Sequence, residues 1–291
     1  MQKPIGESVI KGASADIFCD RFTGQGWERI SVHVPDELEF VIYINQQELV
    51  TILCTPIKLN YLVLGFMYSE GIISGIGDVV MMRVCEERQL IDVKLANAEY
   101  QLPKQRTLTS GCGGGITFTT REQKVDSGLV VTPKEVLSLV RQFQEQMELY
   151  RFSGGVHSSA LSTTKNLLIV AEDIGRHNTL DKILGEVLLK GLSTRDRLLL
   201  TTGRVSSEML RKAARMQIPV VISRHTPTGN AVALAHDLGI ALVGVRGSRL
   251  LVYSHPERLG CPSSGTQTRL PRTLGAKIKG DTPSFLEVSL G

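Results

Sequence analysis

The residue with the clearest capacity for chemistry is a single cysteine set among glycines. Cys112 follows Ser110-Gly111 and precedes Gly113-Gly114-Gly115. Glycines leave a thiol without side-chain cover and permit positive φ angles, so this cysteine can approach a partner and pass a group to it. The loop alone is compatible with a nucleophilic carrier thiol at Cys112 but does not select it. The alternative is a glycine-rich turn in which the cysteine is incidental.

The other four cysteines are predicted to play no part in this chemistry. Cys54 and Cys85 lie in apolar strand patterns, where cysteine acts as a small buried hydrophobe, and Cys261 opens a loose tail. Five cysteines at wide spacing, Cys19 included, argue against a disulfide framework. Each is therefore expected to remain a thiol.

Basic residues follow four predicted strands, 167–171, 198–201, 220–222 and 240–244. The first arginines after them are Arg176, Arg204, Arg224 and Arg246. The carboxyl ends of parallel strands meet at one edge of a sheet, where loops and helix N-termini bind ligands. Arginines, hydroxyls and backbone N–H groups collected there suit phosphate oxygens. We therefore expect a phosphorylated or nucleotide-bearing ligand at this edge.

A structural explanation of the same arginines stays open. They can pair with the carboxylates Glu172, Asp173, Asp181 and Glu208 as ordinary ion pairs. His177 and His225 lie at the same edge and can be acid/base groups, phosphate donors or solvated loop residues. His157, in a turn that contains Gly154 and Gly155, is the better site candidate.

Metal and dinucleotide motifs are missing. The chain has neither the C-x2-C spacing of structural zinc nor the H-x-E and P-C-x-x-C pair of a zinc deaminase. It also lacks a G-x-G-x-x-G turn between a strand and a helix. We expect no metal held by the protein and no Rossmann-type cofactor.

The composition of the chain limits which partners and which cellular location can be expected. The chain has 291 residues, 42% of them hydrophobic, and a net charge of +4, too small an excess to predict nucleic acid or a membrane surface as partner. It has no apolar run of about 18 residues and no apolar stretch near Met1. A cytoplasmic protein is expected.

Three parts are predicted along the chain. Residues 1–130 form an α+β part that carries the Cys112 loop, with strands at 30–34, 40–44, 49–54, 79–84 and 90–95 and a helix at 59–70. Residues 131–260 form an α/β core with a mixed, largely parallel sheet, helices at 178–190, 206–216 and 229–237, and a helix that begins at the capping box Thr132–Glu135 and carries its apolar stripe to Tyr150. Residues 261–291 form a flexible tail rich in Ser, Thr, Gly and Pro.

Several segments together resemble the formate dehydrogenase accessory sulfurtransferases, the FdhD/NarQ family, over roughly residues 28–258. These segments are Leu64–Ile73, Ser110–Gly113, Gly155–His157, Glu172–Lys182, Gly203–Glu208, Pro227-Thr228, Leu242–Arg246 and Val252-Tyr253. The resemblance implies a cytidine-deaminase-like core without deaminase chemistry. It also implies a sulfur carrier that takes persulfide sulfur from a cysteine desulfurase and delivers it to the molybdenum bis(molybdopterin guanine dinucleotide) cofactor, which activates formate dehydrogenase.

The resemblance assigns roles to residues. The persulfide cysteine falls on Cys112, and the cofactor-binding segment falls on Gly244, Val245, Arg246, Gly247, Ser248 and Arg249. The predicted sheet edge adds further cofactor-binding candidates: Arg176, His177, Arg204, Arg224 and His157. Two pyrophosphates in the cofactor would require such a set of arginines. Cysteine desulfurase, formate dehydrogenase and a second copy of the chain in a homodimer are the expected partners.

Two departures from the family matter. Gly115 stands where relatives often place the second cysteine of a C-x-x-C loop, so Cys112 would have to act alone. Residues 54–60 are less acidic than in relatives, which is expected to alter partner contacts. A chaperone that binds the cofactor without moving sulfur and a scaffold between desulfurase and dehydrogenase stay open as alternatives.

Overall fold

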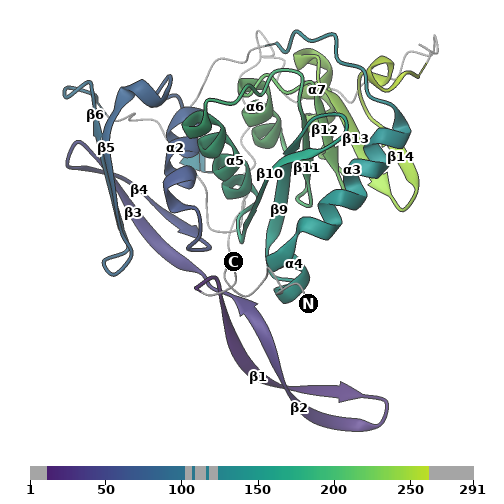
Figure 1. Ribbon diagram of the computed structural model, residues 1–291, viewed down its shortest axis with the longest axis horizontal. Helices are drawn as coiled ribbons and strands as arrows, with labels where there is room; N and C mark the ends of the chain where they lie inside the picture. Colours follow the sequence, from purple (N-terminus) through teal and green to yellow (C-terminus); the bar gives the residue numbers. More distant parts are fainter. Residues whose placement is uncertain (1–11, 102–106, 109–115, 118–123, 262–291) are drawn as a thin grey trace, which may run out of the picture.

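The fold is built on two β-sheets that are joined by a pair of helices (Figure 1). A computed structural model describes residues 12–101, 107–108, 116–117 and 124–261 of the chain. Within these residues the protein is a mixed α/β protein, as the sequence predicts. The likeness to cytidine deaminases and the boundaries at residues 130 and 260 stay predictions.

The smaller sheet has the strand order β4-β3-β6-β5. Its strands are β3 (Leu38–Ile44), β4 (Gln47–Cys54), β5 (Val79–Cys85) and β6 (Leu90–Leu95), and helix α2 (Leu59–Ser69) and the 3-10 turn η1 (Ile76–Asp78) lie between β4 and β5. Asn45 and Gln46 adopt positive φ angles of 49° and 68°, which is the geometry that turns β3 tightly into β4. One face of this sheet packs on α2 around Phe40, Ile42 and Met67.

The larger sheet has the strand order β10-β9-β11-β12-β13-β14. Its strands are β9 (His157–Ser162), β10 (Leu167–Asp173), β11 (Leu198–Thr201), β12 (Val220–Ser223), β13 (Ala241–Arg246) and β14 (Arg249–Val252). Parallel pairing is confined to β11, β12 and β13, because β9 inserts antiparallel between β10 and β11 and β14 folds back on β13. Since β9 is antiparallel to both neighbours, β10 still runs in the direction of β11, β12 and β13.

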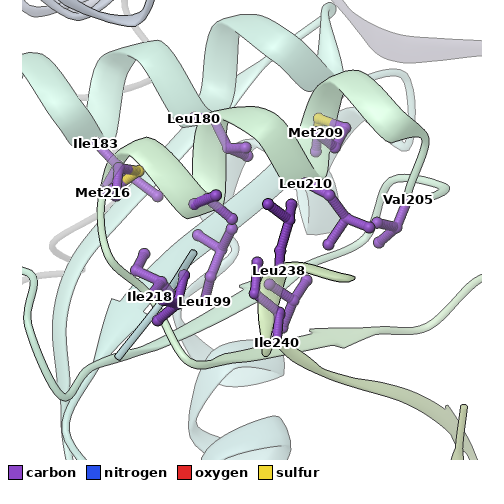
Figure 2. Close-up of a cluster of buried hydrophobic side chains, with 14 of the residues drawn as sticks. Leu180, Ile183, Leu199, Val205, Met209, Leu210, Met216, Ile218, Leu238 and Ile240 are labelled. Atoms are coloured by element: carbon purple, nitrogen blue, oxygen red, sulfur yellow. The ribbon is translucent and has the colours of Figure 1, made fainter. Parts of the chain in front are cut away.

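Helices cover both faces of the larger sheet (Figure 1). Helices α5 (Arg176–Lys190), α6 (Ser207–Arg215) and α7 (Gly229–Leu238) pack on one face, and α3 (Pro133–Gln146) packs on the other. Figure 2 shows the hydrophobic cluster on the face covered by α5, α6 and α7, to which Ile183 of α5, Leu210 of α6 and Leu199 of β11 belong. The apolar faces of these helices are thus buried against the sheet.

The two sheets are joined by close contact between α2 and α5. A Cβ placed on Gly65 of α2 would lie 1.8 Å from the backbone oxygen of Asp181, and one on Gly185 of α5 would lie 1.9 Å from that of Tyr61. Each glycine therefore faces the carbonyl of the residue four positions before the other glycine. Only residues without a side chain permit this approach.

Shorter elements complete the described chain. Strands β1 (Ser14–Thr23) and β2 (Gly26–Pro35) form a long hairpin, β7 (Thr107–Leu108) pairs with β8 (Ile116–Thr117), α4 (Glu148–Ser153) precedes β9, and the 3-10 turn η2 (Pro256–Leu259) follows β14. No helix in the described ranges is both long enough and apolar enough to cross a membrane.

Most predicted elements are confirmed within a few residues, and two are corrected. The predicted helix through Tyr150 is broken at Met147 into α3 and α4. The segment that begins at His157 was expected to be a polar turn, but it is strand β9, which lies inside the sheet between β10 and β11. Residues 14–23 and 249–252 also form strands that were not predicted.

Residues 54–60, which were expected to alter partner contacts, are engaged within the chain. Thr55 is fully buried, and its backbone N–H donates to Asp173 at 3.2 Å. The ammonium group of Lys58 contacts Glu186 at 2.7 Å and the backbone oxygen of Val170 at 3.1 Å. The segment therefore ties the smaller sheet to β10 and α5.

Candidate functional site

The strand ends that were predicted to bind a ligand do lie at one edge of the larger sheet. Strands β10, β11, β12 and β13 run in one direction and end at Asp173, Thr201, Ser223 and Arg246. Ser223, the last residue of β12, pairs with Gly244, and β13 continues two residues further. β9 starts at the same edge, where His157 pairs with Asp173. The segments 173–178, 201–208, 223–228 and 245–249, with His157, are called the strand-end edge below.

Arg224 and Arg246 are held together at this edge. The guanidinium of Arg246 donates to the backbone oxygen of Arg224 and, at 2.8 Å, to the hydroxyl of Thr226. The backbone N–H of Arg224 donates to Thr201 at 3.3 Å, which ties the loop after β12 to the end of β11. Arg204, Arg224 and Arg246 are all exposed, so three cationic side chains are available at the edge.

Arg176 lies differently from the other three arginines. It is the first residue of α5 and is buried. A Cβ on Gly203 would lie 2.9 Å from the Cβ of Arg176, so the loop after β11 passes directly over this side chain. Arg176 therefore lies beneath the edge, whereas the sequence predicted it on the same rim as Arg204, Arg224 and Arg246.

Two histidines at the edge are held in their neutral form. Burial lowers the pKa of His157, and the nearby charges of Arg176 and His225 lower it further. Burial also lowers the pKa of His177, although contact with Glu208, 3.2 Å from its Nε2 atom, opposes the shift. Neutral imidazoles at neutral pH can donate hydrogen bonds to phosphate or take up a proton when an anion binds. His225 is exposed at the same edge.

The carboxylates that were offered as structural partners of the arginines are occupied by other groups. Asp173 lies 2.6 Å from the ammonium group of Lys182, and Asp181 lies 2.6 Å from that of Lys212. Glu172 accepts hydrogen bonds from the backbone N–H groups at the start of α4 and from Ser158.

Glu208 is next to His177, and the histidine lowers the pKa of Glu208. Among the described residues, no ion pair joins Arg204, Arg224 or Arg246 to a carboxylate. The purely structural explanation of these three arginines therefore lacks the pairs that it requires.

Buried hydroxyl groups hold the loops of the edge in place. Ser159 of β9 bonds to Thr179 of α5 at 2.7 Å and to Thr201 of β11 at 3.0 Å. Ser223 donates to the backbone oxygen of Gly203 at 2.9 Å. These bonds connect three strand ends and one helix start, so the edge is a rigid platform.

The predicted cofactor segment Gly244–Arg249 forms the β13–β14 hairpin. Gly244 and Val245 are buried, and a Cβ on Gly244 would lie 2.9 Å from the ring of Tyr253. Gly247 turns the chain with a φ of 59°, and Ser248 and Arg249 are exposed. Direct contact with a ligand is therefore open to Arg246, Gly247, Ser248 and Arg249, whereas Gly244 and Val245 build the support.

Cys112 lies outside the described residues, so its role stays a prediction. The cysteine in β4 is confirmed as a buried hydrophobe: burial raises the pKa of Cys54 to about 12. Cys19 and Cys261 are exposed, and Cys85 is half-buried. Cys54 is thus a poor nucleophile at neutral pH.

Sequence reasoning missed the group that anchors the edge from below. Lys182 is fully buried in α5, and its ammonium group contacts Asp173 at 2.6 Å and the backbone oxygens of Thr55 and Glu172 at 3.1 Å each. Asp173 also accepts hydrogen bonds from Gly175 and Asn178 at 2.8 Å. No signal in the sequence marked Lys182, because Glu186 stands four residues later on the same helix and offers a local partner.

The fold and the site together define a class of protein: a mixed α/β protein with a basic, hydroxyl-rich edge at the ends of its strands. The chain matches the FdhD/NarQ family over residues 35–260 and belongs to it. It is 37% identical over 232 residues to the Sulfur carrier protein FdhD of Bacillus subtilis (strain 168). The aligned region covers 77% of this chain and 88% of that protein.

Two further comparisons agree. The Sulfur carrier protein FdhD of Listeria innocua is 37% identical over 252 residues, covering 82% of this chain and 96% of the relative. A crystal structure of a putative formate dehydrogenase accessory protein from Desulfotalea psychrophila superposes with a TM-score of 0.70 at 26% identity, and the match covers 85% of this chain and 99% of that one.

Proposed function

We propose that this chain is a sulfur carrier that serves the maturation of a formate dehydrogenase. The observation that carries the proposal is its similarity, over nearly the whole length of the relatives, to proteins that bear the name Sulfur carrier protein FdhD. The accessory role named for the Desulfotalea psychrophila structure supports the same assignment. Cysteine desulfurase and formate dehydrogenase are then its partners in the cytoplasm, together with a second copy of the chain.

Cys112 is the proposed carrier of sulfur. Its thiolate attacks the outer sulfur of a cysteine persulfide on the desulfurase, which forms a new S–S bond on Cys112 and releases the donor cysteine as a thiolate. In delivery, the outer sulfur leaves Cys112 as a neutral atom and the electron pair of the S–S bond stays on Cys112. A reduced molybdenum centre in the acceptor provides the two electrons that convert this atom to sulfide. Because Gly115 replaces a second cysteine, no disulfide within the loop competes with delivery.

The strand-end edge is the proposed binding site for the acceptor, the molybdenum bis(molybdopterin guanine dinucleotide) cofactor. The two pyrophosphates of this cargo carry the charge that exposed arginines recognise in bidentate fashion. Arg204, Arg224 and Arg246 are exposed there without a carboxylate partner among the described residues, which fits an anionic ligand. His157 and His177, with lowered pKa values, can add hydrogen bonds to phosphate oxygens.

Sulfur loading tests the proposed function. The purified chain is incubated with a cysteine desulfurase and cysteine, and intact mass and peptide mapping measure the sulfur added. We expect one sulfur atom on Cys112, removable by reductant, in the original chain and in the control Cys19→Ser, which removes another exposed thiol. No adduct, or an adduct that persists in Cys112→Ser, would refute the carrier role.

Nucleotide binding tests the site. Calorimetry with guanosine diphosphate is run on the original chain, on Arg246→Ala and on the control Arg141→Ala, which removes an exposed arginine from α3 on the other face of the sheet. Loss of a charged hydrogen bond to phosphate is worth about 1.5–3 kcal/mol, so Arg246→Ala should weaken binding about 10- to 100-fold. Equal affinity in both variants would remove Arg246 from the site. Tight binding without any sulfur loading would favour the chaperone alternative.

A further inference from the structure

Helices α5 and α6 lie side by side on one face of the larger sheet, and two pairs of charged groups join them (Figure 1). His177 and Asp181 lie four residues apart on α5, and Glu208 and Lys212 lie four residues apart on α6. At the strand-end edge, the Nε2 atom of His177 lies 3.2 Å from the Oε2 atom of Glu208. One helical turn further from the edge, the ammonium group of Lys212 lies 2.6 Å from Asp181.

The inner pair is buried and is fixed by a third helix. The side chains of Lys212 and Asp181 are 11% and 3% exposed, and both carboxylate oxygens of Asp181 contact the ammonium group. Ser69 of α2 donates to the same carboxylate at 3.0 Å, and Glu70 lies 3.9 Å from Lys212. Moving the ammonium group away would leave a buried carboxylate unpaired. The positive charge of Lys212 is therefore held in a constant place, one turn from the outer pair.

The outer pair is partly open to solvent and can change its charge. The side chains of His177 and Glu208 are 17% and 24% exposed. A carboxylate only accepts hydrogen bonds, so Nε2 of the neutral imidazole carries the proton and Nδ1 is left to take up another. Burial lowers the pKa of His177, contact with Glu208 raises it, and the charges of Lys212 and Arg176 lower it. The neighbouring His157 of β9 acts on it as well.

We propose that His177 takes up one proton from solvent when a phosphate-bearing ligand binds at the strand-end edge, and that Glu208 and Lys212 are the positioning residues that set the pH at which it does so. The inference rests on the proposed function, because it takes this ligand to be the pyrophosphate part of the cofactor. An anion near the imidazole favours the imidazolium ion. Ligand and proton therefore bind cooperatively, and each raises the affinity for the other by the same factor.

The titration of His177 is measured directly by NMR on the full chain with ¹³C-labelled histidine, first without ligand and then with saturating guanosine diphosphate. The His177→Gln variant identifies the signal among those of the six histidines. We expect the bound nucleotide to move the midpoint of the titration to higher pH. Bound nucleotide with an unmoved midpoint would overturn this inference and leave the proposed site intact. A chain that binds no guanosine diphosphate at any pH would refute the proposed site and the inference with it.

Substitutions on α6 should move the ligand-free midpoint in opposite directions. Glu208→Gln removes the carboxylate that favours the imidazolium ion and should move the midpoint of His177 to lower pH. Lys212→Met removes a positive charge, leaves the negative charge of Asp181 in its place and should move the midpoint to higher pH, whereas Lys212→Arg keeps the charge and should retain the original midpoint. The control Lys190→Met, at the exposed end of α5, should not move it.

These opposed shifts separate the proposed role from a purely structural one, which would change stability alone. Because Glu208 is partly exposed, Glu208→Gln decides the matter by itself if circular dichroism shows that Lys212→Met does not fold. Midpoints that stay in place, or that move the same way in both variants, would contradict the inference.

Nucleotide affinity shows whether the proton matters for binding. Calorimetry gives the affinity for guanosine diphosphate between about pH 8 and pH 6, and the ratio of the original chain to His177→Gln removes the titration of the nucleotide itself. This ratio should rise as the pH falls, by at most about 10-fold for each pH unit, because a single proton is taken up. The rise should begin at lower pH when Glu208→Gln replaces the original chain in the ratio. A ratio that does not change with pH would overturn the inference.

Discussion

The substitution Gly65→Ala tests how the two sheets are held together. By helix propensity alone, alanine in place of glycine inside α2 would stabilise the protein by about 1 kcal/mol. In the structure, the added Cβ would lie 1.8 Å from the backbone oxygen of Asp181 and 2.8 Å from the backbone nitrogen of Gly185. Real Cβ atoms do not approach other atoms within 3.0 Å, and backbone cannot turn aside as a side chain can. The two helices would therefore have to separate by more than about 1 Å.

That separation opens the contact on which both sheets depend. It would stretch the bond from Ser69 of α2 to Asp181 of α5, now 3.0 Å, and loosen the packing around both. Overpacking of this kind costs about 1–3 kcal/mol, and the lost helix contacts add to it, so we expect a net loss of at least about 3 kcal/mol. For a chain of this size the melting temperature should fall by about 6–12 °C.

The assay is thermal unfolding followed by circular dichroism, with Gly77→Ala as control. A Cβ on Gly77 meets nothing within 4 Å, so this variant should melt with the original chain. Gly185→Ala, which faces Tyr61 in the same way, should behave like Gly65→Ala. A Gly65→Ala variant that melts at or above the original temperature would refute the packing argument.

Three further outcomes follow from buried groups. Lys182→Met leaves the buried carboxylate of Asp173 without its ammonium partner and should lower the free energy of unfolding by about 3–5 kcal/mol in urea titrations. The control Lys190→Met, at the exposed end of α5, should change this free energy little. Equal effects of the two substitutions would contradict the buried pair. The pKa of His157 is lowered from 6.5, so below about pH 6.5 the unfolded chain binds a proton at this residue more readily than the folded chain does, and the free energy of unfolding should fall as the pH drops. Melting temperatures are compared for the original chain and His157→Gln between pH 8 and 5. Curves of melting temperature against pH that run parallel in the two proteins would disprove this. With a pKa of about 12 and no exposure, Cys54 should resist alkylation at pH 8 while Cys19 reacts, and peptide mapping that finds both labelled at one rate would be inconsistent with the structure.

Helices with strong local signals were predictable from the sequence. The capping box forms as expected, with the side chain of Glu135 accepting from the backbone N–H of Thr132 at 2.8 Å and the hydroxyl of Thr132 accepting from that of Glu135 at 3.3 Å. The predicted helix at 59–70 is α2, which ends one residue earlier. Local caps and apolar spacing determine such elements, so a single sequence contains the information.

Strand β9 was hidden because its burial is polar. Ser158 and Ser159 are buried and bond to Glu172, Thr179 and Thr201, so the segment lacks the apolar alternation that indicates a strand. Those partners are distant in sequence or lie in other elements. Missing β9 also led to a sheet that was expected to be more parallel than it is.

The candidate site was predictable in its position and less so in its detail. Strand direction alone brought Arg204, Arg224 and Arg246 to one edge, because strands joined by helical crossovers run the same way. The burial of Arg176 depends on the close passage of Gly203, which no local pattern encodes. The buried pair beneath the edge was equally invisible, since it joins side chains through the fold.

Transfer of labelled sulfur from Cys112 to its acceptor tests the central claim most directly. The chain is loaded with isotopically labelled sulfur by a desulfurase, freed of donor, and mixed with formate dehydrogenase and its reduced molybdenum cofactor, and the label on Cys112 is followed by mass spectrometry. The proposed function predicts that the label leaves Cys112 and appears on the cofactor at a rate that Arg246→Ala slows and Arg141→Ala does not. Label that stays on Cys112, or that leaves equally fast without the cofactor, would contradict it.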